Sequence, residues 1–254
     1  MNTLFIGKNM LFLPEVESTN TYAINLLRNV NIVDGTVIYT DEQTQGKGQR
    51  GTVWASETGK NITLSAILQP HFLDIKQSFY LSKITALACY DVLTEILDAS
   101  HYDIKIKWPN DILVNMKKIG GILIENNLNG SKIQHAVIGI GLNVNQQNFG
   151  DLSVFATSIK IEKNEDFNTS IILESLCSKL EKWYFKLKEN KFDFIHSNYL
   201  AHLFGLNETF NFIDNLGHNF YAEIINVEEN GKLLVRNTND ELLTFDIKEV
   251  KIII

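Results

Sequence analysis

Two hydrophobic periods alternate along most of the chain. Short runs rich in β-branched residues, bounded by Gly, Pro or Asn, predict strands. Longer stretches with an apolar residue at every third or fourth position predict amphipathic helices, each of which covers a sheet with one face. Strands are expected at residues 11–16, 35–40, 61–68, 103–108, 112–114, 119–125 and 133–145, and helices at about 22–30, 76–97, 168–187 and 192–203.

The turn signals between these strands indicate how the strands pair. A turn at Asn115 to Lys118 joins two short apolar runs, and Asn129-Gly130 joins the next two, so each pair is expected to form a hairpin. Successive hairpins give an antiparallel or mixed sheet instead of a doubly wound parallel one. We therefore expect an α+β fold, with a mixed, mainly antiparallel sheet flanked by helices.

The pattern changes near Asn207, where short strands begin to follow one another with only turns between them. This spacing is typical of a small β-barrel. The strands are expected at residues 210–213, 220–227, 232–237 and 242–247. The sequence therefore predicts two domains, one of residues 1–206 built on the large sheet and one of residues 207–254 forming a small SH3-like barrel.

Composition narrows the class of protein. Apolar residues make up 44% and charged residues 21% of the 254 positions, as in an ordinary folded protein. The formal net charge is −7 and the cations are scattered, which argues against a general nucleic-acid binder. No apolar run approaches the roughly 20 residues that span a membrane. We expect a soluble, cytoplasmic protein without DNA or membrane partners.

Cysteine and histidine residues give no sign of a metal site. Cys89 and Cys177 lie far apart in apolar helical patterns, so we expect buried core thiols and a reducing compartment. The six histidines form no close pair of the kind found in zinc sites.

The stretch from Gln43 to Trp54 carries the first candidate chemistry. It joins two predicted strands and has three glycines within six positions, which lets the backbone come close to a ligand. Two cations in the same loop favour a phosphate ligand. The residues at its centre are Gly46, Lys47, Gly48, Gln49, Arg50 and Gly51.

Three other interpretations of this glycine loop are possible. The glycine spacing fits the dinucleotide fingerprint, but that fingerprint must open a helix, and a strand follows here. With Val53 it also fits the kinase glycine loop, yet the chain has no His-Arg-Asp or Asp-Phe-Gly triplet. A flexible charged surface hairpin stays open on the glycine pattern alone.

A second candidate site combines residues 107–111 with residues 118–123. An Asn-Asp pair at a strand end, a lysine on the following turn and a double glycine bring an amide, a carboxylate, a cation and exposed backbone into one small volume. Each part also has a purely structural explanation. The Pro-Asn-Asp segment is a common turn, the lysine can be a solvated residue of a hairpin tip, and the two glycines can form a bulge. Likewise, Ser18 and Thr19 fit simple helix caps, although a helix start also attracts anions.

Taken together, five motifs resemble the biotin–protein ligases, also called biotin–[acetyl-CoA-carboxylase] ligases. They occur in that family's order and cover about residues 14 to 145, with the terminal β-domain also as expected. The motifs are Glu17-Ser18-Thr19-Asn20, Gln43 with the glycine loop and Trp54, Lys107-Trp108-Pro109-Asn110-Asp111, Lys118 with Gly120-Gly121, and Gly139-Ile140-Gly141-Leu142-Asn143-Val144.

Two departures from the family pattern stand out. Lys47 and Gln49 take places where the best-known bacterial members carry arginines. The chain also starts directly at the catalytic domain, without the winged helix of the family's repressor members. The resemblance therefore implies a short form that does not bind DNA specifically.

The resemblance implies a reaction in two steps. Biotin and ATP with Mg²⁺ form biotinyl-AMP, and a lysine of a biotin carboxyl carrier protein or domain then accepts the biotinyl group. No dedicated metal site is implied, and a homodimer is possible. The implied catalytic residues are Lys118, Arg50 and Asp111; the biotin-binding residues are Ser18, Thr19, Asn20, Gln43, Gly46, Lys118 and Gly121; the ATP- or adenylate-binding residues are Lys47, Gly48, Gln49, Arg50, Trp54, Asn110 and Asn143.

Two alternatives of function stay open. Lipoate–protein ligases share the architecture and the adenylation chemistry, so the acyl group is either biotin or another small carboxylate; the glycine loop favours biotin. A binding module without turnover is the other alternative, against which an intact Lys118 argues. Trp54 either closes over the adenylate or packs as a core aromatic.

Overall fold

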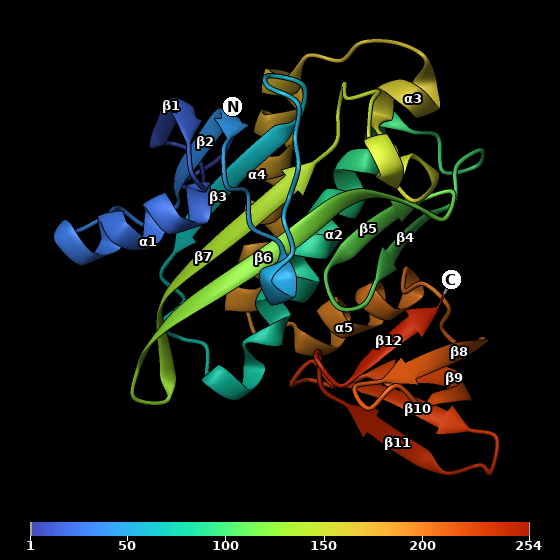
Figure 1. Cartoon of the computed structure of the whole chain (residues 1–254). Helices are drawn as coiled ribbons and strands as arrows, with labels where there is room; N and C mark the ends of the chain where they lie inside the picture. The colour runs from blue at the N-terminus through green and yellow to red at the C-terminus, as the bar shows by residue number, and fades with distance from the viewer. Residues whose placement is uncertain (1, 254) are drawn as a thin grey trace.

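The computed structural model describes residues 2–253, apart from the side chain of Arg50, and is built around two sheets (Figure 1). The larger sheet has seven strands in the order β1-β2-β3-β7-β6-β5-β4. Only β1 and β2 are parallel, so the predicted mixed, mainly antiparallel sheet is confirmed. Its strands are β1 Met10–Val16, β2 Thr36–Gln43, β3 Ile62–Leu68, β4 Ile104–Lys107, β5 Asp111–Val114, β6 Lys117–Asn129 and β7 Lys132–Leu142.

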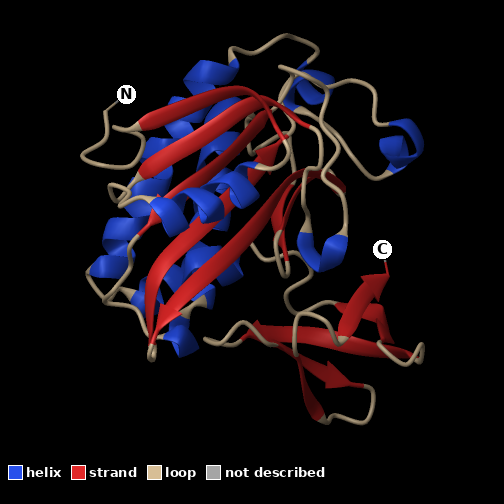
Figure 2. Cartoon of the chain, turned by 60° about the vertical axis from the view of Figure 1, so that its left-hand side comes forward, coloured by secondary structure: helices blue, strands red, loops and turns tan. Residues whose placement is uncertain are grey.

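Helices cover both faces of this sheet. Alternate residues of a strand point to opposite faces, and accordingly Val37 and Ile38 belong to separate core clusters. The smaller cluster lies under α1, and the larger lies under α2 and α4 on the far side of the sheet (Figures 1 and 2). The α-helices are α1 Thr19–Asn29, α2 Phe79–Ile96, α3 Ile159–Lys163, α4 Thr169–Lys188 and α5 Phe192–Ala201.

Most of the predicted helices and strands are present within a few residues of the expected bounds. The short α3 and the helical turns η1 Gln49–Gly51, η2 Ile75–Gln77 and η3 Gly150–Val154 were not predicted. The predicted turn at residues 115–118 is shorter than expected: Asn115 and Met116 turn the chain with positive φ, and Lys117 and Lys118 already belong to β6. Lys118 is therefore a strand residue and not part of a hairpin tip.

The C-terminal sheet has five antiparallel strands in the order β11-β10-β9-β8-β12. Its edge strands, β11 and β12, do not pair with each other within the described residues, so the expected barrel is an open sheet here. Strand β12 was not predicted. The strands are β8 Thr209–Asp214, β9 Asn219–Val227, β10 Leu233–Asn237, β11 Leu242–Phe245 and β12 Val250–Ile253. The domain boundary at 207 stays a prediction.

The two sheets are fastened to each other by buried polar contacts. The indole N–H of Trp108 donates to the carbonyl of Gly231, at 2.8 Å. The fully buried Lys83 of α2 reaches His196 of α5 at 3.0 Å and the carbonyl of Glu228 at 3.3 Å. Burial lowers the pKa of Lys83 to about 8. Since one core cluster runs through both sheets, the C-terminal sheet is packed against the large one.

The cysteines lie in the core, as their apolar patterns predict. Cys89 and Cys177 are free thiols in the core, and burial raises the pKa of each to about 12. Within residues 2–253, none of the helices combines the length and the apolar character needed to cross a membrane.

Candidate active site

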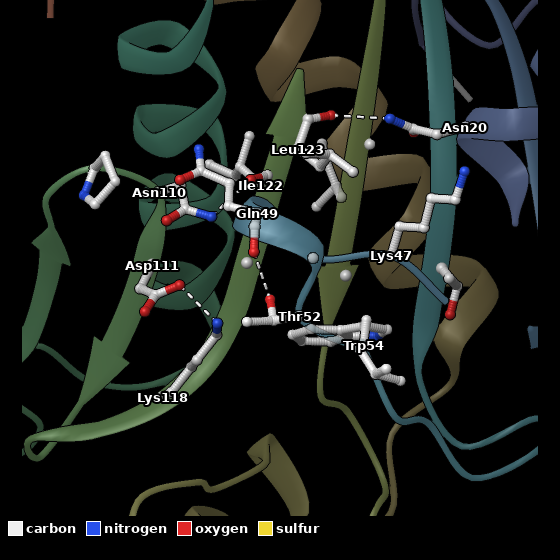
Figure 3. Close-up of a pocket in the computed structure, with 18 of the residues that line it drawn as sticks. Asn20, Lys47, Gln49, Thr52, Trp54, Asn110, Asp111, Lys118, Ile122 and Leu123 are labelled. Carbon is white, nitrogen blue, oxygen red and sulfur yellow. Dashed lines mark hydrogen bonds and ion pairs between the residues drawn. The ribbon is translucent and has the colours of Figure 1, made fainter. Parts of the chain in front are cut away.

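A cavity of about 400 Å³ lies between the large sheet, the glycine loop and the C-terminal sheet. Figure 3 shows the side formed by the large sheet and the glycine loop. It brings together segments that are far apart in the sequence, from the start of α1 to strand β12. Twelve of the predicted site residues line it: Ser18, Thr19, Asn20, Gln43, Lys47, Gly48, Gln49, Trp54, Asn110, Asp111, Lys118 and Gly121. Gly46 and Asn143 do not, and the side chain of Arg50 lies outside the described part of the chain.

One end of the cavity is neutral and closely hydrogen-bonded. Ser18 caps α1, and the backbone N–H of Thr19 donates to the side-chain oxygen of Gln43 at 2.8 Å. The Thr19 hydroxyl reaches the same oxygen at 3.2 Å. These contacts hold the first turn of α1 against the end of β2, with Ser18 and Thr19 both buried. The end offers neutral hydroxyl and amide groups to a ligand.

Asn20 anchors this polar end to the middle of the sheet. Its amide donates to the carbonyl of Leu123 at 3.2 Å (Figure 3) and to the carboxylate of Glu125 at 2.8 Å. Its oxygen accepts from the buried hydroxyl of Ser65 at 2.6 Å. Any side chain at Gly139 would collide with the Asn20 amide, so the glycine there makes room for it. Asn20 therefore has its partners within the protein and orients its neighbours in α1.

The glycine loop folds back on itself as a small hairpin. The N–H of Gly48 donates to the carbonyl of Thr52 at 2.7 Å, and the N–H of Trp54 donates to the carbonyl of Gly46 at 2.9 Å. A side chain at Gly46 would clash with the Trp54 carbonyl. Gly46 thus shapes the loop without lining the cavity, and its contact with biotin stays a prediction. The loop sets Lys47 and Gln49 at the cavity wall (Figure 3).

Trp54 forms part of the cavity wall instead of packing in the core. Its indole lies against Gly121 and Gly141, where a side chain at 141 would overlap the ring. The Lys118 ammonium is 5.6 Å from the ring centre, within range of a cation–π contact. The indole N–H is buried and has no hydrogen-bond partner among the described residues. Trp54 therefore sits between the two glycine strands and the charged end of the cavity.

The other end of the cavity is charged. Lys118 and Asp111 form an ion pair with 2.6 Å between nitrogen and oxygen (Figure 3). Both side chains are partly exposed, at 38% and 23%. The pair is held on two adjacent strands, so the cation stays at the cavity even though each side chain is reachable by solvent.

A β-bulge places Lys118 on this face of the sheet. Asp111 pairs with Gly121, but Leu113 pairs with Lys118 because the register between β5 and β6 shifts at Ile119. Without the extra residue, Lys118 would point to the opposite face from Asp111. The predicted bulge at Gly120-Gly121 therefore lies one residue earlier, and it is what joins Lys118 to Asp111 and Gly121.

Lys107 is a second cation at this end, and its charged form is disfavoured. Burial is the main cause that lowers the pKa of Lys107; the charges of Lys118 and Lys251 lower it further, and Asp111 opposes them. Next to it, Asn110 exchanges hydrogen bonds of 2.9 Å with the backbone of Ile122. Asn110 therefore holds the strand ends together while it lines the cavity.

Asn143 is buried behind the cavity. Its amide donates to the carbonyl of Thr157 at 3.0 Å, and Thr157 in turn donates its N–H to the carbonyl of Lys118 at 2.9 Å. Its side-chain oxygen is buried without a partner among the described residues. The structure thus gives Asn143 a role in supporting the Lys118 strand, while direct contact with an adenylate stays a prediction.

Sequence reasoning missed several residues of the site. Ser65 and Thr63 on β3 belong to a strand that carries no motif, and Lys251 lies on the unpredicted β12. Lys107 was quoted within a motif but was not assigned a role. The alternation of Val250, Lys251 and Ile252 could have indicated a strand with Lys251 on its polar face. The sequence does not indicate which neighbouring strand this segment pairs with.

Comparison with known proteins identifies the family. Residues 12–143 match the model of the Biotin/lipoate A/B protein ligase family. The bifunctional ligase/repressor BirA of Bacillus spizizenii is 31% identical over 238 residues, which cover 92% of this chain and 71% of that protein. The biotin–[acetyl-CoA-carboxylase] ligase of Paracoccus denitrificans is 30% identical over 200 residues, or 77% of this chain and 81% of that one.

The fold is also known. The structure resembles the biotin protein ligase of Aquifex aeolicus in complex with biotin and ATP, with a TM-score of 0.79, 23% sequence identity, and coverage of 96% of this chain and 99% of that one. The family model, the two relatives and this likeness of fold agree with the resemblance seen in the five motifs. The chain therefore belongs to the biotin/lipoate A/B protein ligase family, and within it to the biotin–protein ligases.

Proposed function

We propose that the protein activates biotin as biotinyl-AMP and transfers the biotinyl group to a lysine of a biotin carboxyl carrier protein or domain. The observation that carries the proposal is a single cavity with a neutral, hydrogen-bonding end and a cationic end at Lys118. Biotin has this division of polarity, with an uncharged ureido group at one end and a carboxylate at the other. The names of the relatives, biotin–[acetyl-CoA-carboxylase] ligase among them, support the same substrate and the same kind of acceptor.

The polar end of the cavity favours biotin over lipoate. A ureido ring both donates and accepts hydrogen bonds, and Ser18, Thr19 and Gln43 supply matching groups. The dithiolane ring of lipoate offers neither donor nor acceptor, so the additional hydrogen bonds that a ureido group would form here are not available to lipoate. The acyl chain would then run past Gly121 and the Trp54 ring to Lys118.

In the first step, a carboxylate oxygen of biotin bonds to the α-phosphorus of ATP, and the bond to pyrophosphate breaks. Two anions approach each other in this step, so a fixed cation between them stabilises the transition state most. Lys118 would take that position, since Asp111 holds its ammonium at the cavity before the substrates arrive. Lys107 adds positive charge on the side where the phosphates would lie.

Magnesium would enter with the nucleotide. The described residues contain no group of three His, Cys, Asp or Glu side chains that could hold a metal. Asp111 is the carboxylate of the cavity lining and would contact a magnesium ion held by the phosphates. The ion supplies charge neutralisation to the departing pyrophosphate.

In the second step, the ε-amine of the acceptor lysine attacks the carbonyl carbon of the mixed anhydride, and AMP leaves with the bonding electrons. The intermediate is reactive toward water, so the site must exclude water until the carrier docks. The glycine loop and Trp54 form the wall that covers this part of the cavity (Figure 3).

Three further properties belong to this proposal. They are a homodimer, the absence of specific DNA binding and a cytoplasmic location.

The decisive experiment supplies the protein with ATP, magnesium and either biotin or lipoate and measures acyl-AMP by mass. Biotinyl-AMP is expected, followed by biotinylation of an apo carrier domain when it is added. A carrier domain with its target lysine replaced by Arg is the control and should stay unmodified. Lipoyl-AMP in place of biotinyl-AMP would change the substrate assignment, and the absence of both would refute the proposed activity.

A further inference from the structure

Strand β12 of the C-terminal sheet forms part of the cavity wall. Val250, Lys251 and Ile252 all line the cavity, although β12 pairs with β8 and belongs to the other sheet. The side chains of Val250 and Ile252 are buried, at 3% and 5% exposure, in the shared core. Lys251 alternates to the other side of the strand and is exposed. The strand is thus anchored by its neighbours and presents one cation to the cavity.

The charged end contains more positive than negative charge. Lys107, Lys118 and Lys251 gather around a single lining carboxylate, Asp111. Asp111 is paired with Lys118, and neither Lys107 nor Lys251 forms an ion pair with any side chain within residues 2–253. Their mutual repulsion is visible in Lys107, whose pKa is lowered mainly by burial and further by both other lysines. A cluster of this kind attracts anions, and a bound multiply charged anion would relieve the repulsion.

The position of Lys251 relative to this cluster is fixed by contacts between the sheets. Trp108 follows Lys107 directly in the chain and donates its indole N–H to Gly231 of the C-terminal sheet at 2.8 Å. Lys83 donates to the carbonyl of Glu228, which lies in the same turn as Gly231. Because these contacts are buried, the C-terminal sheet does not swing freely, and Lys251 is preorganised at the cavity.

We propose that Lys251 binds the β- and γ-phosphates of ATP, which leave as pyrophosphate, so that the C-terminal sheet completes the nucleotide site. Lys118 lies beside Trp54 and Gly121 and serves the junction of carboxylate and α-phosphate. Lys251 lines the same cavity from β12, and Lys107 lies within electrostatic range of both lysines. This assignment rests on the proposed function, and it adds to it a residue outside the motifs of the catalytic sheet.

The test compares Lys251→Ala and Lys251→Glu with Lys248→Ala. Lys248 is an exposed lysine three residues away that does not line the cavity. The KM for ATP in biotinyl-AMP formation should rise roughly tenfold in Lys251→Ala, as expected for one lost charge-assisted contact, and further in Lys251→Glu. Inhibition by added pyrophosphate should weaken in parallel. Biotin binding without ATP and the melting temperature should not change, and Lys248→Ala should behave as wild type.

Two outcomes would overturn the assignment. An unchanged KM for ATP in both Lys251 variants would show that the lysine does not bind the nucleotide. A raised KM for the apo carrier domain with an unchanged KM for ATP would assign it to the acceptor protein instead. Calorimetry with inorganic triphosphate separates this test from the activity itself: weaker binding by Lys251→Glu supports the phosphate site even if the wild type forms no biotinyl-AMP.

Discussion

The two ends of the cavity are built on opposite principles. At the polar end, Thr19, Gln43 and Asn20 already have hydrogen-bond partners within the protein. At the charged end, the carboxylate of the cavity lining, Asp111, is already paired with Lys118, and Lys107 and Lys251 add two further cations. The first end is complete before a ligand arrives and selects by shape and hydrogen bonding. The second gains most from a ligand, so we expect selectivity and catalysis to be separable by substitution.

Lys118→Ala should have the largest effect of these substitutions, and the effect should be on the rate of adenylation. Lys118 is placed to offset charge that is greatest as the two anions meet, so its loss should slow adenylation more than it weakens biotin binding. A donor of this kind is worth on the order of 3 kcal/mol, or roughly a hundredfold in rate. Single-turnover formation of biotinyl-AMP measures the loss.

Lys117→Ala is the matched control for that substitution. Lys117 is the neighbour of Lys118 on β6, so its side chain points to the opposite face of the sheet. It should be nearly silent in the same assay. If both variants lose activity equally, Lys118 is a surface residue of the strand and its catalytic assignment is wrong.

Gln43→Leu should break the polar end instead. It removes the acceptor of the buried Thr19 N–H, and leaving such a donor unpaired costs about 1–3 kcal/mol. Biotin affinity, measured by calorimetry, should fall roughly tenfold to a hundredfold, while the adenylation rate at saturating biotin is kept. The exposed Gln45, changed to Leu, serves as control. A loss of rate with unchanged affinity would contradict the separation of the two ends.

The pH dependence of nucleotide binding should reveal Lys107. Burial favours its neutral form and lowers its pKa, so as pH rises Lys107 loses its charge earlier than an ordinary lysine, whose pKa is about 10.4. Its attraction for phosphate is present below the lowered pKa and is lost above it. The KM for ATP should therefore rise by a few fold at alkaline pH. Lys107→Arg keeps its charge and should flatten the profile; an unchanged profile would assign the pH dependence to another group.

The smallest expected effect concerns the glycine loop, which borders both ends. Its hydrogen bonds at Gly48 and Trp54 are internal to the loop, so few contacts tie it to the sheet and ligands should order it further. Amide exchange across residues 44–54 should slow by a few fold with biotin and ATP together. Biotin alone tests whether the polar end is sufficient to order the loop. Unchanged exchange with both ligands would show that the loop is already in its final state.

The sequence predicts best those features that depend on residues close together in the chain. The periodicity of residues 168–187 predicts α4 almost to its ends, since helix pattern is a local property. The motif residues Ser18, Gln43, Asp111 and Lys118 meet in one cavity because each lies at the end of an element that the pattern identifies. Their chemistry could be predicted before their distances were known.

Features that depend on distant pairing could not be predicted in this way. The face that Lys118 occupies depends on one extra residue at Ile119, and a one-residue shift in register changes the face of every following side chain. Strand β12 is a four-residue run whose partner, β8, lies far upstream in the chain. Lys251 and Ser65 therefore enter the site through tertiary pairing, which no local pattern encodes.

The hydrogen bond from Trp108 to Gly231 limits how this protein can be recombined with its relatives. A chimera that exchanged the C-terminal sheet would have to bring a carbonyl to the same place, or the indole N–H would be buried without an acceptor. The penalty would arise one residue from Lys107, at the charged end of the cavity. We therefore expect exchanged C-terminal sheets to fail through loss of turnover before they fail through loss of folding, and grafts that keep the turn at Glu228 to Gly231 to be the ones that work.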